Sequence, residues 1–180
     1  MSDKPTRSVL CLFPDRENDK LEEFRRKHIK NPGKSIPFHI TLFHKFYLPE
    51  QLDDKIIEKL RSVASNTKSF EFDARPISYF PTTRVLYLNP SPVSFIEKIN
   101  KKLFHEFPDF YESEYGYPVY HMTIAFNNAV EEVNKIIHEY IHVFGKDPLK
   151  LKAGKIGIYS QFDKEWKEIM SFDFEKGEVL

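Results

Sequence analysis

The chain contains two short motifs in which a threonine follows a histidine at the second position. The motifs are His39-Ile40-Thr41 and His121-Met122-Thr123, and no other histidine in the 180 residues has Ser or Thr at this distance. Both motifs lie in apolar runs, 38–43 and 119–126, that are typical of β-strands. Because alternate side chains of a strand point to opposite faces, each His and its Thr should share one face. The residues between and beside them should face a core.

Two imidazoles and two hydroxyls are suited to the cleavage of a phosphodiester. Histidine titrates near neutral pH, so one ring can accept the proton of the attacking oxygen while the other protonates the leaving oxygen. A hydroxyl on the same face can donate a hydrogen bond to a non-bridging oxygen as negative charge develops there. Since positioning carries much of phosphoryl transfer, we expect such a site to work without a metal or other cofactor.

The elements that must position these motifs recur in one order: strand, helix, motif strand, helix, strand. The first round comprises 8–13, 15–28, 38–43, a helix beginning at Pro49, and 69–73, and the second comprises 84–88, 95–104, 119–126, 130–144 and 149–159, followed by a strand over 168–174. Such repetition indicates an internal duplication. If an approximate two-fold axis relates the halves, His39 and His121 approach one central cleft from opposite sides. We therefore expect one domain over residues 1–180, made of two lobes.

Composition limits the possible partners. Lys plus Arg and Asp plus Glu number 27 each, so the chain has no net charge, which argues against a long nucleic-acid footprint and allows a nucleotide or short oligonucleotide. Cys11 is the only cysteine, so an intramolecular disulfide is excluded. The first apolar run is too short for a signal peptide or a membrane span. We expect a cytoplasmic monomer without membrane contact.

With these motifs in this order and at this separation, the chain resembles the 2H phosphoesterase superfamily. Within it, the chain is most similar to the 2′-5′ RNA ligase-like and cyclic phosphodiesterase branches. The resemblance spans nearly the whole chain and includes the stretch 80–88 and the closing pair of strands. It implies a duplicated, two-lobed α+β fold in which antiparallel sheets face a central cleft and helices lie outside.

The resemblance also implies a function and roles for the motif residues. The expected activity is metal-independent cleavage of RNA-type phosphodiesters: 2′,3′-cyclic phosphates, 2′-5′-linked or cyclic oligonucleotides. His39 and His121 would be the acid–base pair, and Thr41 and Thr123 the phosphate donors. We assign activation of the nucleophile to His121 and protonation of the leaving oxygen to His39.

Three further residues are candidates for substrate binding. Ligase-named relatives often carry an arginine shortly after the second motif, whereas this chain has Ile124-Ala125-Phe126. Arg84 either compensates or is a solvated charge at a strand end. Phe43 and Tyr159 either stack on a nucleobase or belong to the core, and Phe43 is expected on the His39 face. His44 alternates to the buried side and is expected to be structural.

Two alternative functions come from other classes of protein. The four motif side chains could bind AMP-like phosphates without turning them over, which would make the chain a nucleotide-binding module. His138-Glu139-Tyr140-Ile141-His142 matches the H-E-x-x-H pattern of zinc peptidases on a predicted helix. The apolar stripe of this helix runs through Ile137 and Ile141, so a charged helix face is the competing interpretation.

Overall fold

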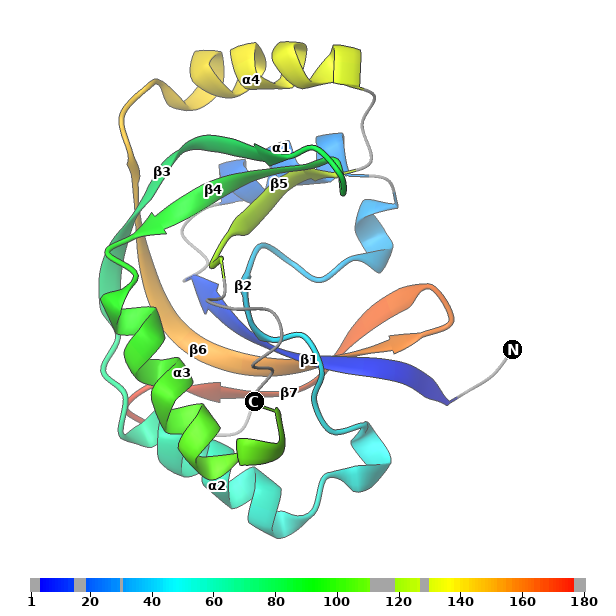
Figure 1. Ribbon diagram of the computed structural model, residues 1–180, viewed down its shortest axis with the longest axis vertical. Coiled ribbons are helices and arrows are strands. Elements are labelled where there is room, and N and C mark those ends of the chain that lie inside the picture. Colours follow the sequence, from blue (N-terminus) through cyan, green and yellow to red (C-terminus); the bar gives the residue numbers. More distant parts are fainter. Residues whose placement is uncertain (1–3, 15–18, 30, 111–118, 127–129, 177–180) are drawn as a thin grey trace.

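The computed structural model describes residues 4–14, 19–29, 31–110, 119–126 and 130–176 (Figure 1). The described residues form an α+β fold around an antiparallel sheet, as the resemblance implies. In chain order the elements are β1 (Pro5–Pro14), α1 (Asp19–His28), β2 (Ile40–Phe43), α2 (Asp54–Ser65), β3 (Phe70–Phe80), β4 (Val85–Ser91), α3 (Ser94–Glu106), β5 (Met122–Phe126), α4 (Val130–Phe144), β6 (Leu149–Phe162) and β7 (Glu165–Asp173).

The order of strands in the sheet reflects the predicted duplication. The order is β2-β1-β6-β3-β4-β5, so each motif strand, β2 or β5, lies at one end beside the first strand of its own half. The third strands of the two halves, β3 and β6, pair at the centre and make the sheet continuous between the lobes. Strand β7 pairs with the part of β6 that lies beyond β3.

The two ends of the sheet approach each other because the sheet is strongly curved. Figure 1 shows β2 and β5 on the inside of the bend formed by β3 and β6. A parallel bridge between Ile29 and Phe126 ties the end of α1 to β5, the motif strand of the other half. Curvature therefore brings together motifs that are far apart in both the chain and the sheet order.

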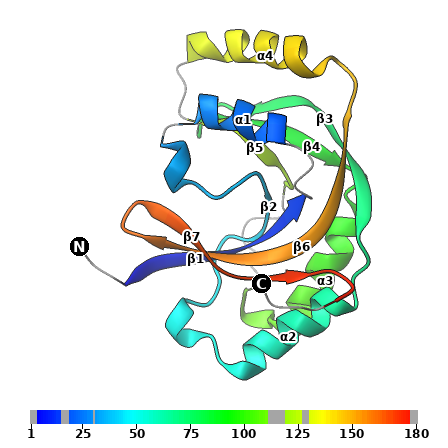
Figure 2. The same cartoon turned by 180° about the vertical axis from the view of Figure 1, so that it is seen from behind.

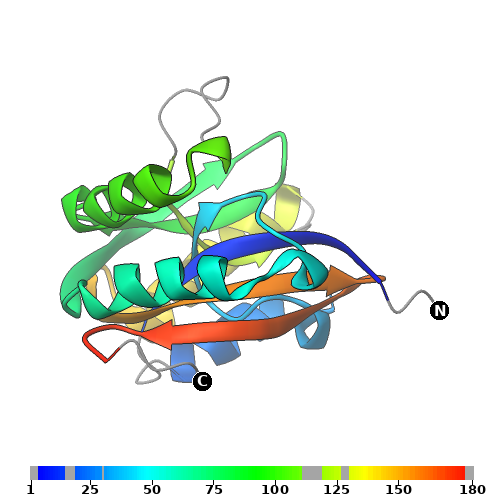
Figure 3. The same ribbon diagram turned by 90° about the horizontal axis from the view of Figure 1, so that it is seen from below.

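The helices form two pairs, each with one member from each half. Helix α1 lies beside α4 (Figure 2). Phe24 of α1 packs edge-on against Tyr140 and Phe144 of α4, with ring centroids 5.7 and 5.6 Å apart. Helices α2 and α3 lie side by side on another part of the molecule (Figure 3). Helix α4 ends as predicted at Gly145, whose φ of +80° suits glycine and whose N–H donates to the carbonyl of Ile141.

Buried side chains hold both motif strands in place. The residues flanking the motif positions belong to the main hydrophobic core: Phe38, Ile40, Leu42, Tyr120, Met122 and Ile124. Burial of a large apolar side chain contributes about 1.5–3 kcal/mol, so each strand is anchored by several such contributions. The four motif side chains are half-buried, which confirms the predicted division of faces.

Each motif strand contains a β-bulge directly after its threonine. Thr41 lies opposite Cys11 and Phe43 opposite Leu10, so β2 has one extra residue, Leu42. In β5, Thr123 lies opposite Tyr87 and Ala125 opposite Leu86, so the extra residue is Ile124. A bulge inverts the alternation of faces for every residue that follows it.

This inversion corrects two predictions made for the first motif strand. Phe43 was expected on the His39 face, but it is 3% exposed in the main core and its ring stacks on Phe104 at 4.9 Å. His44 was expected on the buried face, but it is exposed. Both predictions assumed an unbroken period of two.

No helix of the described residues is both long and apolar enough to cross a bilayer.

Candidate active site

The two motif histidines are held by the same local hydrogen bond. Nδ1 of His39 lies 2.6 Å from the carbonyl oxygen of Pro37, and Nδ1 of His121 lies 2.7 Å from that of Val119. A carbonyl only accepts, so Nδ1 carries the proton in both rings and Nε2 of each neutral ring keeps its lone pair. Both lobes therefore present the same ring nitrogen for proton transfer.

The first motif is backed by a small cluster of buried residues separate from the main core. The cluster comprises Val9, Cys11, Phe13, Ile36 and Tyr159. The Phe13 ring centroid lies 6.1 Å from that of His39. Thr41 forms a side-chain hydrogen bond with Cys11, whose thiol has its pKa raised by burial and stays protonated. Thr41 and His39 thus share the face opposite the main core.

The second motif is backed by aromatic rings. His121 meets the rings of Phe80 and Tyr87 edge-on, at 5.2 and 5.3 Å between centroids. These two rings stack on each other at 4.2 Å. Thr123 lies opposite Tyr87 across the β4–β5 ladder. The surroundings of His121 are therefore aromatic, whereas those of His39 combine aromatic, sulfur and charged groups.

Electrostatics connect the two histidines. Burial lowers the pKa of His39 to about 3, and the positive charges of Arg25, His121 and His44 act in the same direction, against the hydrogen bond to Pro37. His121 comes from the other lobe, so this effect links the two halves. At neutral pH the free protein therefore holds His39 as the neutral imidazole.

A buried ion pair in α1 fixes the segment that orients His39. Arg25 is 3% exposed, and its guanidinium donates to Glu22 at 3.2 Å and to the Ile36 carbonyl at 2.6 Å. The second oxygen of Glu22 accepts from the Phe38 N–H at 2.8 Å. These bonds lie on either side of Pro37, whose carbonyl holds His39.

The second lobe uses neutral groups for the corresponding connection. Asn100 of α3 is buried and donates from its side-chain amide to the Tyr120 hydroxyl at 2.6 Å. Tyr120 directly precedes His121, as Phe38 precedes His39. Each histidine is thus tied to the helix that precedes its strand, through an ion pair in one lobe and an amide–hydroxyl bond in the other.

A cavity of about 620 Å³ lies at His121 and takes residues from both lobes. Its lining consists of Arg7, His44, Phe80, Pro81, Thr82, Thr83, Val85, His121 and Phe126. The sequence did not indicate that Arg7 and His44 line this cavity. Arg7 lies in the polar start of the chain. The only signal for a cleft-facing position is that Arg7, Val9 and Cys11 are alternate residues, which share one face of a strand.

The candidate binding residues away from the motifs lie outside this cavity. Arg84 is exposed in the turn between β3 and β4, with a φ of +54°, and does not line the cavity. Tyr159 does share the cluster behind His39, but it is 6% exposed and its hydroxyl donates to Glu168 at 2.5 Å. Little of its ring remains for a nucleobase to stack on.

The residues of the peptidase-like pattern do not assemble a metal site. Glu139 forms ion pairs with Lys27 and His28 of α1, while His138 and His142 are exposed. Among the described residues, no group of three His, Cys, Asp or Glu side chains is placed to hold a metal ion. The pattern is a charged helix face that helps to join α4 to α1.

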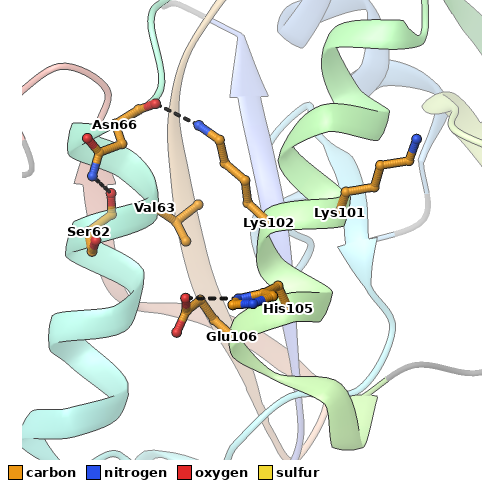
Figure 4. A pocket seen from close by; sticks show the side chains of 7 residues that line it. All are labelled: Ser62, Val63, Asn66, Lys101, Lys102, His105 and Glu106. Atoms are coloured by element: carbon orange, nitrogen blue, oxygen red, sulfur yellow. Dashed lines mark hydrogen bonds and ion pairs between the residues drawn. The ribbon is translucent and has the colours of Figure 1, made fainter.

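A second hollow, of about 370 Å³, lies between α2 and α3 (Figure 4). Its polar groups bond to one another: Lys102 donates to the Asn66 carbonyl at the end of α2, and His105 pairs with Glu106. Lys59 likewise donates to the Glu106 carbonyl at the end of α3. These contacts satisfy carbonyls at helix ends, so this hollow has a structural explanation.

Comparison with protein families places the chain among phosphoesterases. Residues 13–164 match the model of the 2′-5′ RNA ligase superfamily. An inferred phosphoesterase of Oceanobacillus iheyensis is 27% identical over 130 residues, which cover 71% of this chain and 75% of the relative. One of Geobacillus sp. strain WCH70 is 29% identical over 95 residues, covering 52% of this chain and 55% of the relative's length.

Solved structures share the fold. The crystal structure of Escherichia coli LigT complexed with 3′-AMP matches with a TM-score of 0.55 at 13% identity, covering 95% of this chain and 99% of that chain. The crystal structure of TT0787 of Thermus thermophilus matches with a TM-score of 0.62 at 16% identity, covering 94% of this chain and 98% of that chain. At these identities the likeness concerns the fold.

Proposed function

The chain belongs to the 2′-5′ RNA ligase superfamily of 2H phosphoesterases, and from that premise we propose that it is a metal-independent phosphodiesterase. Its substrates are RNA-type phosphodiesters: 2′,3′-cyclic phosphates, 2′-5′-linked or cyclic oligonucleotides. The observation that carries this proposal is the matched pair of histidines. Both donate from Nδ1 to a carbonyl two residues upstream, which leaves Nε2 of each ring for catalysis.

The lowered pKa of His39 supports an assignment of roles. A neutral imidazole accepts a proton, so His39 is the general base and removes the proton of the attacking water or hydroxyl. As the attacking oxygen bonds to phosphorus, the bond to the leaving oxygen breaks and His121, as imidazolium, donates the proton that this oxygen needs. This assignment reverses the one made from the sequence, which could not reveal the burial of His39.

The threonines complete the site. Thr41 and Thr123 lie on the histidine faces of their strands, where their hydroxyls donate to the non-bridging oxygens of the phosphoryl group. Because the site draws on both lobes, residues 1–180 act as one functional unit. LigT, which has the same fold, is known in complexes with 3′-AMP and ATP, and this supports nucleotides as the ligands here.

The test is a panel of 2′,3′-cyclic mononucleotides, 2′-5′ oligoadenylates and cyclic dinucleotides, assayed with EDTA present and with the position of the product phosphate mapped. The proposal predicts turnover of at least one substrate class at a rate that EDTA does not change. Nucleotide binding by calorimetry without any product would instead indicate a binding module. Activity that disappears with EDTA and returns with a divalent metal would contradict the two-histidine mechanism.

A further inference from the structure

The cavity at His121 departs from the symmetry of the two lobes. In the strand ladders, Val9 lies opposite Tyr159 and Val85 lies opposite Phe80, so the two valines occupy equivalent positions in the two lobes. Two residues before them, Arg7 corresponds to Thr83. After the equivalent bulges, His44 corresponds to Phe126. Both members of each pair line the same cavity. The first lobe therefore places two basic side chains where the second places a hydroxyl and an aromatic ring.

Arg7 is held in position without losing its hydrogen-bond donors. Its guanidinium carbon lies 5.0 Å from the centre of the Trp166 ring, and such a contact engages the π-face of the guanidinium while the N–H groups remain available. Within the described part of the chain, no carboxylate pairs with Arg7. Trp166 in turn packs on the cluster behind His39, which fixes its position.

The lining of the cavity divides into a basic side and an aromatic side. Arg7 and His44 bring cationic or protonatable groups, and Thr82 and Thr83 bring hydroxyls, whereas Phe80 and Phe126 bring rings. None of the described residues that line the cavity is acidic. Guanidinium, imidazole and hydroxyl groups together are suited to a phosphate. A volume of about 620 Å³ is in the usual range for a whole ligand of drug size.

We propose that the basic side of this cavity, with Arg7 as its main group, binds a second phosphate of the substrate. This inference rests on the proposed function. If the reacting phosphate is a 2′,3′-cyclic phosphate, the nearest other phosphate lies on the 5′ side of the same nucleoside. The favoured substrates are therefore 5′-phosphorylated nucleoside cyclic phosphates and oligonucleotide ends, over nucleosides that carry only the reacting phosphate.

Two residues of this subsite lie outside the part of the chain that matches the family model. Arg7 and Trp166 both lie outside residues 13–164, the part that matches the family model. They come from the first and last strands of the chain, β1 and β7. The subsite thus combines His44, Thr82 and Thr83 from inside the matched range with Arg7 from outside it.

The experiment compares kcat/KM for adenosine 2′,3′-cyclic phosphate with and without a 5′-phosphate. The wild type should favour the 5′-phosphorylated substrate about tenfold, the effect expected of one charge-assisted hydrogen bond. Arg7→Gln should remove most of this preference. Arg84→Gln is the matched control, since it removes the same charge from the neighbouring turn outside the cavity, and it should retain the preference.

Equal kcat/KM values for the two substrates in the wild type would overturn the subsite while leaving the proposed function intact. Equal losses of preference in Arg7→Gln and Arg84→Gln would overturn the subsite as well. They would indicate that the preference comes from the overall positive charge near the cavity and not from binding by Arg7. If the wild type cleaves neither substrate, 2′,3′-cyclic phosphates are not its substrate class, and calorimetry decides the subsite. Adenosine 3′,5′-bisphosphate should then bind more tightly than adenosine 3′-phosphate to the wild type but not to Arg7→Gln; equal binding by the wild type would contradict the subsite.

Discussion

At the scale of the residue, the two catalytic candidates are alike in their hydrogen bonding and different in their surroundings. His39 is half-buried beside Phe13 and near the charges of Arg25, His44 and His121, all of which oppose its protonation. His121 lies among the rings of Phe80 and Tyr87 and opens to the cavity. Equivalent positions in a duplicated fold can thus be given different chemical environments by their neighbours.

The lowered pKa of His39 predicts the pH dependence of kcat/KM. The imidazole is the active base when neutral, so activity is lost as the pH falls through the pKa of His39 in the free protein. The acidic limb of kcat/KM should therefore lie clearly below about pH 6.5, the ordinary value for histidine. A pH–rate profile together with NMR titration of the His39 ring checks this, and an acidic limb at or above that ordinary value would reassign the base.

The sequence identified the four motif residues but not the residues around them. His39, Thr41, His121 and Thr123 stand out because type and spacing repeat. Arg7 does not, since its place in the cavity depends on how β1 lies against a loop of the other lobe. The position of Phe80 in the cavity lining could likewise not be read from composition, because most of the aromatic residues here are buried.

At the scale of the element, helix α1 serves as the support of the first motif. Glu22 and Arg25 lie one turn apart on α1 and bond to the backbone on both sides of Pro37. A misplacement of the catalytic group by about 1 Å can cost on the order of 100-fold in rate. We therefore propose that Glu22 and Arg25 are positioning residues, which act on the substrate only through His39.

Arg25→Met should lower kcat about 10- to 100-fold, within the cost of such a misplacement, with a smaller change in KM. It removes the donor to Ile36 while Glu22 keeps Arg26 and the Phe38 N–H as partners. The ¹⁵N shifts of the His39 ring should also change, because Nδ1 loses its fixed acceptor.

Arg26→Met is the matched control, since Arg26 is exposed and bonds to the same carboxylate; exposed ion pairs contribute little. Thermal unfolding of both variants shows whether they remain folded. A folded Arg25→Met protein with unchanged ¹⁵N shifts and kcat would limit Arg25 to a structural role.

The β-bulges explain why the sequence did not predict which face the residues after each motif threonine occupy. Alternation correctly placed the residues up to each threonine. After it, two apolar residues follow in succession, Leu42-Phe43 and Ile124-Ala125, which breaks a period of two at the same place in both strands. A bulge there keeps both residues buried, and the repetition of the break was the available signal.

At the scale of the whole molecule, the duplicated fold places both motif strands on the inside of one curved sheet. The order of elements could be predicted, because each half repeats the same series of strands and helices. Pairing of β3 with β6 and the curvature of the sheet could not, since they depend on contacts between the halves. The interlocking of helices, with α1 against α4 and α2 against α3, likewise arises only when both halves pack together.

The central claim is that His39 and His121 act on the same phosphodiester, and a double-mutant cycle tests it most directly. The rates of His39→Ala, His121→Ala and the double variant are compared with wild type on the best substrate, with folding checked for each. Each single variant should lose about 100-fold or more, and the double variant should be scarcely slower than either single one, because residues that act as a unit are non-additive. Losses that multiply, or near-normal turnover in either single variant, would contradict a shared site.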